Sequence, residues 1–186
     1  PSGVWVRFPP EVLVIMPHNK KNIELDIVWF KRDLRTIDNK SLEFASKSAN
    51  PTLFIYIFEP SIINSPDFDQ RHIRFIHESL IDIENRLKKY SLDIFFIKSE
   101  ALEFFQEILK TYKIKNVLSY QEVGNNLTYT RDKKIAKFFR SKNINWIQNK
   151  TNGVIRGLKS RKNWKKKWLD EMKSEIVVTD LNSINK

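Results

Sequence analysis

The sequence predicts an α/β fold, a Rossmann-like, doubly wound sheet of five parallel strands, followed by a basic helical tail. Short, continuous apolar runs alternate five times with amphipathic helical patterns between Ile23 and Gln148. Such runs are typical of strands buried on both faces of a parallel sheet. Strand–helix alternation also requires right-handed βαβ crossovers, which build sheets of this kind. With 186 residues, 41% of them hydrophobic, the chain can form one compact domain with a sizeable core.

Five apolar runs bounded by turn residues mark the strands in chain order. They are residues 27–30 (IVWF), 53–58 (LFIYIF), 92–97 (LDIFFI), 116–118 (NVL) and 144–147 (INWI). Trp29 and Trp146 fall within these runs, so we expect both indoles in the core.

Helical periods lie between the strands. The clearest joins apolar residues from Ile73 to Tyr90 at alternating spacings of three and four, which predicts a helix with one buried stripe. Aspartate and serine side chains commonly accept hydrogen bonds at helix starts. We therefore expect Asp69 to cap this helix, Ser99 a helix over 102–112, and Asp38 a short one through Phe44 and Ala45; a further helix contains Ile135, Phe138 and Phe139.

The chain divides into three predicted regions. Residues 1–22 form a disordered or non-native leader, in which Met16 is the expected natural start, and residues 23–149 form the α/β domain. Residues 150–186 form a basic segment and the start of an interdomain linker. We find neither a membrane-spanning apolar run nor a signal peptide, so a cytoplasmic location and no membrane partner are expected.

Composition excludes several kinds of site. The chain has no cysteine, which rules out disulfides, thiol nucleophiles and cysteine-bound metals. His72 and His77 lie five residues apart and so do not form an HExxH zinc pair. The four glycines do not spell a dinucleotide-binding or Walker A loop. No catalytic or metal-ligating residue is assigned.

Polar residues follow the first, second and fourth predicted strands. In open α/β sheets, ligands bind beyond the carboxyl ends of the strands, where the strand order reverses. The candidates for a small polar or charged ligand are Arg32, Asp33, Arg35, Glu59, Glu122 and Asn125. The alternative is that the first three form ion pairs that tie down their loop. Glu59 and Glu122 are either an acid–base pair or, as we favour, solvated strand-end carboxylates.

The tail concentrates positive charge. Residues 150–173 hold nine Lys and Arg against Asp170 and Glu171, a net +7 of the chain's +11. Trp164 and Trp168 lie four residues apart, on one face of an expected helix. These tryptophans and cations either bind nucleic acid by stacking and phosphate neutralisation, or pack against protein beneath a solvated lysine face.

The strand-end residues carry a family resemblance. Residues 27–35 (IVWFKRDLR), followed by Asp38-Asn39, resemble the opening "WFRRDLR…DN" signature of the photolyase/cryptochrome family. Further segments resemble the family's later blocks in the same order: Phe58-Glu59-Pro60; Arg71-His72 with Phe75 and Glu78-Ser79-Leu80; Glu122 with Tyr129-Thr130-Arg131-Asp132; and residues 152–156 with Arg161, Trp164 and Trp168. The similarity spans residues 23 to 172.

The resemblance implies the N-terminal α/β domain of a DNA photolyase- or cryptochrome-like flavoprotein, active in blue-light-driven DNA repair or light signalling. In the family this domain packs on a helical, FAD-binding domain, which we expect to lie outside this chain; the chain alone would then be inactive, whereas its full-length relative would be a deoxyribodipyrimidine photo-lyase. The domain also holds a light-harvesting antenna in many members. Its candidate contacts are the six strand-end residues.

A deazaflavin or flavin antenna is more consistent with the sequence than a folate, and the absence of any antenna is the remaining alternative. Folate-binding members carry a histidine where this chain has Asn64-Ser65-Pro66-Asp67. The resemblance also suggests that Arg156, Arg161, Trp164, Lys165 and Trp168 contact DNA or the FAD-binding domain. The alternative is a stand-alone basic nucleic-acid-binding or structural interaction module.

Overall fold

The computed structural model describes residues 24–186 apart from residues 152 and 157. The expected leader over residues 1–22, with a start at Met16, lies outside the described residues.

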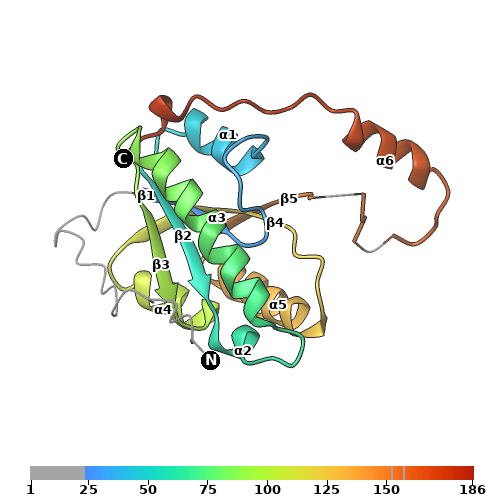
Figure 1. The fold of residues 1–186 in the computed structure, drawn as a ribbon, viewed down its shortest axis with the longest axis horizontal. Helices are drawn as coiled ribbons and strands as arrows, with labels where there is room; N and C mark the ends of the chain where they lie inside the picture. The colour runs from blue at the N-terminus through green and yellow to red at the C-terminus, as the bar shows by residue number, and fades with distance from the viewer. Residues whose placement is uncertain (1–23, 152, 157) are drawn as a thin grey trace.

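A five-stranded, all-parallel sheet forms the centre of the molecule, as predicted (Figure 1). The strands are β1 (Glu24–Phe30), β2 (Thr52–Phe58), β3 (Ile94–Lys98), β4 (Lys113–Tyr120) and β5 (Asn145–Asn149), in the order β3-β2-β1-β4-β5. β1 pairs with β2 on one side, where Ile27 lies opposite Leu53, and with β4 on the other, where it lies opposite Val117. The strand order reverses at β1, because β2 and β3 are added on one side of it and β4 and β5 on the other. Since all the strands are parallel, the carboxyl ends of β1, β2 and β4 lie side by side at one edge of the sheet.

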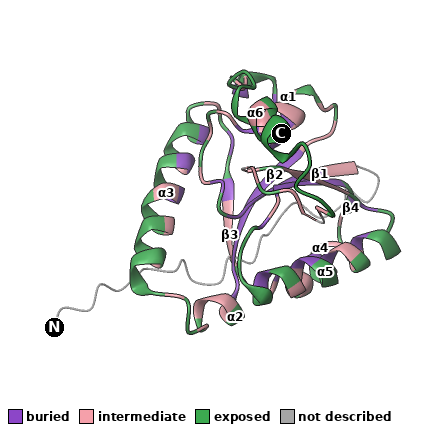
Figure 2. Ribbon diagram, turned by 90° about the vertical axis from the view of Figure 1, so that its right-hand side faces the viewer, coloured by how far each residue is buried: buried purple, intermediate pink, exposed green. Residues whose placement is uncertain are grey.

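Helices cover both faces of the sheet (Figure 2). One face carries α1 (Lys40–Lys47) and α3 (Gln70–Lys88), and the other carries α4 (Ala101–Ile108) and α5 (Asn126–Ser141). Alternate residues of each strand therefore enter two separate cores. On the first, Phe30 and Phe54 pack with α3; on the second, Trp29 packs edge-on against Phe105, with ring centroids 5.3 Å apart.

One predicted helix cap is confirmed and two are wrong. Asp69 caps α3 in a capping box, in which its carboxylate accepts the Arg71 N–H and the His72 ring accepts the Asp69 N–H. Asp38 does not cap α1, because it takes a left-handed conformation (φ 52°) one residue too early, and the buried Asn39 accepts the N–H groups instead. Helix α4 begins after Glu100 with no side-chain cap, since Ser99 lies outside the cap position.

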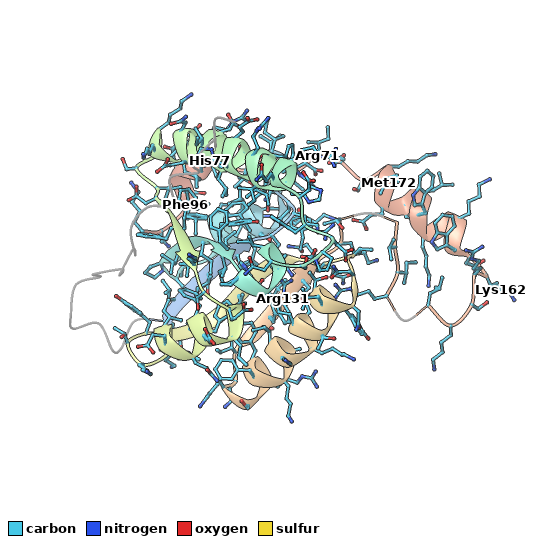
Figure 3. The ribbon with its side chains drawn as sticks, turned by 60° about the horizontal axis from the view of Figure 1, so that its bottom comes forward. Arg71, His77, Phe96, Arg131, Lys162 and Met172 are labelled. Carbon is cyan, nitrogen blue, oxygen red and sulfur yellow. The ribbon has the colours of Figure 1, made fainter. Side chains whose placement is uncertain are left out.

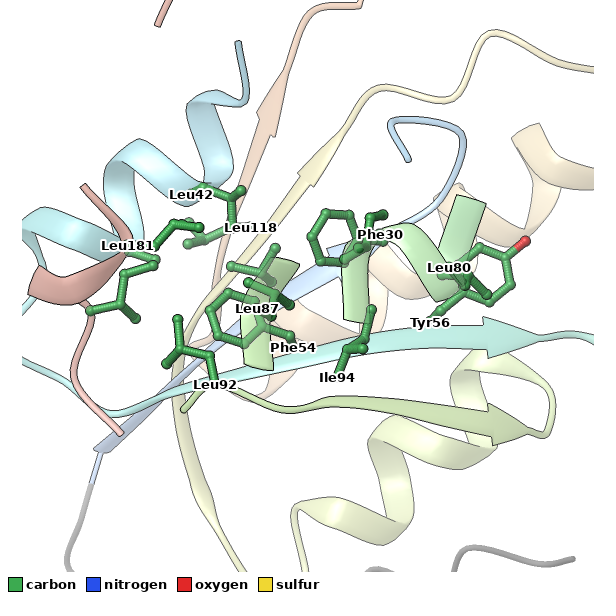
Figure 4. Packing of buried hydrophobic residues seen from close by; sticks show 14 of the residues in the cluster. Phe30, Leu42, Phe54, Tyr56, Leu80, Leu87, Leu92, Ile94, Leu118 and Leu181 are labelled. Atoms are coloured by element: carbon green, nitrogen blue, oxygen red, sulfur yellow. The ribbon is translucent and has the colours of Figure 1, made fainter. Parts of the chain in front are cut away.

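The tail leaves the sheet and then returns to it. After β5 the chain runs out to α6 (Trp164–Met172), which stands away from the body of the molecule in Figure 1. The following segment comes back to a short 3₁₀ helix, η1 (Leu181–Ser183). Leu181 and Ile184 join the core beside Leu42 of α1 (Figure 4), and the Thr52 N–H at the start of β2 donates to the Asn185 carbonyl. The residues expected to begin a linker thus contribute to the α/β core.

The described part of the chain contains neither a membrane-spanning helix nor a cluster of metal-ligating side chains. No helix there is long and apolar enough to cross a membrane. Within the same residues, no three His, Cys, Asp or Glu side chains come together as a metal site would require.

Candidate ligand cavity at the carboxyl edge of the sheet

A cavity of about 390 Å³ opens where the strand order reverses. Its walls come from the ends of β1, β2 and β4, from α3 and α5, and from the short helix α2 (Pro60–Ile63). Much of the wall is apolar, from residues such as Phe30, Tyr56, Phe58, Ile63, Phe68 and Phe75. This is the edge at which the sequence predicted a ligand, and the volume lies within the roughly 300–1,000 Å³ typical of small-molecule sites.

Four of the six predicted residues line this cavity. Arg32 comes from the loop after β1, Glu59 from the end of β2, and Glu122 and Asn125 from the loop after β4. Asn125 caps α5 by accepting the Thr128 N–H at 3.2 Å, and its Nδ2 donates to Asp67 at 3.1 Å. That second bond ties the start of α5 to the loop before α3 and closes one side of the cavity.

Arg131 organises the charged side of the cavity and was not among the predicted site residues. Its guanidinium donates to Glu59 at 2.5 Å, to Glu122 at 3.3 Å and to Asp132 at 2.9 Å. It projects from α5 toward the strand ends, as Figure 3 shows. The sequence contained a signal for this contact. Thr128 and Asp132 fall at helical spacing on the same face as Ile135 and Phe139, and polar residues on an apolar face indicate a polar partner. Both are buried in the structure.

The expectation of solvated carboxylates at the strand ends is wrong. Glu59 and Glu122 are only 4% and 7% exposed, because the helix above them supplies the arginine that makes burial tolerable. Burial raises the pKa of Glu59, and the positive charge of Arg131 opposes that rise. Burial disfavours the charged form of Arg131, but Glu59, Asp132 and Glu122 outweigh it, so its pKa is raised. Both glutamates serve as partners in a buried ion-pair cluster.

Arg32 closes this cluster from the solvent side. Its side chain is 64% exposed and pairs with the buried Glu122. Gly124 makes the approach possible, since an added Cβ there would lie 2.6 Å from the Thr128 hydroxyl and 3.0 Å from the Arg32 guanidinium. Arg32 is therefore a predicted site residue that lines the cavity and remains open to solvent.

Asp33 and Arg35 do not line the cavity. Asp33 is buried and accepts the Lys31 N–H at 3.1 Å, and burial raises the pKa of its carboxyl. Arg35 turns toward α1, where it donates to the Asp38 carbonyl at 3.0 and 2.9 Å. These two residues therefore hold their own loop in place through polar contacts, which is the alternative to ligand binding that the sequence left open.

The predicted tail residues divide into a group that contacts other parts of the chain (Arg156, Trp164 and Trp168) and a group that faces solvent. Arg156 faces inward, where it donates to the Glu122 carbonyl and lies 3.5 Å from Asp132. Trp164 and Trp168 stack with ring centroids 6.2 Å apart, and the Trp164 indole N–H donates to the Gly153 carbonyl at 3.1 Å. Both rings remain more than a third exposed. The second group, Arg161 and Lys165, is exposed on the outside of the tail.

Comparison with known proteins identifies a family and several relatives of this chain. The model of the DNA photolyase family matches residues 26–173. The (6-4)DNA photolyase of Arabidopsis thaliana is 30% identical over 100 residues, which cover 49% of this chain and 18% of that protein. Cryptochrome DASH of Solanum lycopersicum is 26% identical over 142 residues, or 73% of this chain and 24% of that protein. The chain spans about a fifth of the length of these curated relatives.

Two solved structures share the fold. An archaeal photolyase from Sulfolobus tokodaii, crystallised with two FAD molecules, superposes with a TM-score of 0.68 at 19% identity, over 84% of this chain and 37% of that one. A class III photolyase from Agrobacterium tumefaciens gives 0.65 at 18% identity, over 77% of this chain and 30% of that one. At these identities the likeness establishes the fold.

Proposed function

Since this chain belongs to the DNA photolyase family, which includes the cryptochromes, and forms its N-terminal α/β domain, we propose that it holds a light-harvesting chromophore. The chromophore occupies the cavity at the carboxyl edge of the sheet. In the full-length protein the domain packs on a C-terminal FAD-binding domain, and the whole acts in blue-light-driven DNA repair or in light signalling. The α/β domain alone has no repair activity.

The cavity is the observation that carries this proposal. Its aromatic and aliphatic walls can enclose a flat ring system, and Glu59, Glu122 and Arg131 place charged groups at the strand ends beside it. That combination of a largely apolar pocket with a few converging polar groups is what small-molecule recognition requires. Arg32, Glu59, Glu122 and Asn125 are the proposed polar contacts, and Arg131 positions the two glutamates.

A flavin or deazaflavin suits this cavity better than a folate. The loop 64–67 supplies no histidine, and the nearby His72 is committed to the α3 cap through its Nδ1. The Sulfolobus tokodaii photolyase contains two FAD molecules, and its structure was described as implying a novel light-harvesting cofactor. That relative supports a flavin-type ring in this domain.

The test is reconstitution of the chain with candidate chromophores. Riboflavin, FMN, FAD, 8-hydroxy-5-deazariboflavin and methenyltetrahydrofolate are titrated and binding is followed by fluorescence anisotropy. We expect saturable binding of a flavin or deazaflavin. Ser65→Trp, which places an indole at the cavity wall, should abolish it. The matched control Ser141→Trp, at the exposed end of α5, should bind normally. Equal binding by both variants, or no binding by the unmodified chain, would overturn the proposal.

A second candidate function is a contact between the tail and a nucleic-acid backbone. Six cations lie between residues 159 and 167 with no acidic residue among them. Their side chains are exposed, and none forms a salt bridge with a residue that the structure describes. The stacked Trp164 and Trp168 offer partly exposed aromatic faces nearby, and bases stack on such faces.

Salt dependence tests this contact. Replacing Lys165, Lys166 and Lys167 with Gln should lower the slope of log affinity against log salt for single-stranded DNA by about 2, because each lost phosphate contact contributes about 0.7. The control replaces three exposed lysines of α5 and its end, Lys134, Lys137 and Lys142. An equal effect of the two triple variants would show that only net charge matters, and the tail would then lose its assignment.

A further inference from the structure

Lys31 places a buried amine in the wall of the cavity. It follows β1 directly, and its side chain is 4% exposed. Its Nζ lies 4.9 Å from the ring centre of Trp29 and 5.4 Å from that of Trp146. No described group forms a hydrogen bond with Nζ. A buried ammonium normally has several such bonds, because its desolvation is costly.

The acidic groups near Lys31 are engaged elsewhere. Its nearest carboxylate oxygen is Asp132 Oδ2 at 3.6 Å, and the same carboxylate also serves Arg131 and Arg156. Asp33, on its own loop, accepts the backbone N–H of Lys31 rather than the amine.

The two glutamates at the strand ends are engaged as well. Glu59 binds Arg131, while Glu122 binds Arg131 and Arg32. Three arginines thus share most of the negative charge at this edge, and Asp132, which pairs with Lys31 at 3.6 Å, is shared with two of them.

Burial lowers the pKa of Lys31, and the charge of Asp132 opposes that decrease. A purely structural side chain at this position would gain by being apolar, since the rings of Trp29 and Trp146 pack against methylene groups equally well. A negative charge entering the cavity changes this balance. It would stabilise the protonated amine, and by reciprocity the protonated amine would stabilise the anion.

We propose that Lys31 makes the cavity select a chromophore whose ring system carries a negative charge over the neutral form of the same ring. The inference rests on the proposed function and narrows its ligand class to heteroaromatic rings with an ionisable group, such as a hydroxyl. Lys31 is then a specificity-determining residue. Its charge acts over several ångströms in a site of low dielectric, so direct contact with the anion is not required.

The probe is 8-hydroxy-5-deazariboflavin, because ionisation of its ring hydroxyl changes its absorption spectrum. We expect the bound probe to ionise at a lower pH than the free probe. In Lys31→Met, affinity for the ionised form should fall by about tenfold and the ionisation midpoint should rise by about one pH unit, because the two changes are linked. Affinity for riboflavin, which is neutral, should not change. Lys31→Arg, which keeps the charge, should restore selection.

Two controls keep the result interpretable. Lys47→Met removes an exposed lysine of α1 that pairs with Glu43, and it should behave as the unmodified chain. Lys31→Gln, which also removes the charge, serves if Lys31→Met fails to fold.

The two possible failures are distinct. Binding of the probe with the same midpoint and affinity in Lys31→Met overturns this inference and leaves the chromophore proposal standing. Failure of every chromophore to bind the unmodified chain overturns both.

Discussion

Replacing Arg131 with methionine is the sharpest test of the buried charge cluster. In the folded chain this guanidinium is 12% exposed and binds three carboxylates, those of Glu59, Glu122 and Asp132. Methionine fills a similar volume without the charge. We expect the variant to be less stable at pH 7 by about 3–5 kcal/mol, the usual cost of removing one partner from a buried ion pair and leaving the other uncompensated.

The pH dependence of this loss follows from Glu59. Burial already raises the pKa of Glu59, and Arg131 is the main opposing charge; without it that pKa rises further. A carboxyl whose pKa is higher in the folded than in the unfolded state destabilises the fold at high pH, and the penalty disappears below its unfolded pKa of about 4.3. The deficit of the variant should therefore be largest near pH 7 and shrink as the pH falls toward 4.

Urea unfolding followed by circular dichroism at several pH values measures this deficit. Arg140→Met is the control, since Arg140 lies exposed in the last turn of the same helix and its side chain donates to the Ala136 carbonyl rather than to a carboxylate that the structure describes. A loss below about 1 kcal/mol, or one that stays constant between pH 7 and pH 4, would refute the assignment of Arg131 as the counter-charge of the buried glutamates.

Three further changes test individual contacts. Asn39→Ala removes the cap that accepts the Ser41 and Leu42 N–H groups and should cost about 1 kcal/mol in urea unfolding; an unchanged midpoint would contradict the cap. Leu181→Ala should cost about 2 kcal/mol because the side chain is 8% exposed in the core, whereas Val178→Ala, at 84% exposure, should be close to neutral. Gly153→Ala should push the Trp168 ring away, because an added Cβ there overlaps the indole; tryptophan emission should change while global stability stays within about 0.5 kcal/mol, the usual range at surface sites.

Local sequence patterns determined the layers of this fold. Continuous apolar runs marked all five strands, and the spacing from Ile73 to Tyr90 marked the face of α3 that buries Leu80, Ile83 and Leu87. The caps were less predictable. Asp69 was identified because its helix starts beside it. Asp38 was misassigned because it takes a left-handed conformation, and its N–H donates to the Val177 carbonyl, far along the chain.

The candidate site was predictable as an edge but not as a set of contacts. Strand ends and charged loops placed Arg32, Glu59 and Glu122 at one side of the sheet from the sequence alone. The pairing of β1 with β4 and the packing of α5 on the sheet decided which of these residues line the cavity and which partners they bind.

The physical reason is the range of the interactions. Periodicity reports how each segment buries its own apolar residues, so it reveals elements and their faces. Arg131 and Glu59 are 72 residues apart, and Leu181 packs in the same core as Leu42, far earlier in the chain. Such neighbours meet only when the sheet order is fixed. The sequence by itself therefore determined the strands, the helical faces and the charged edge of this protein. Only the tertiary structure decided that Arg131 joins the glutamates, that Lys31 shares its nearest carboxylate with two arginines, and that the tail returns to the core.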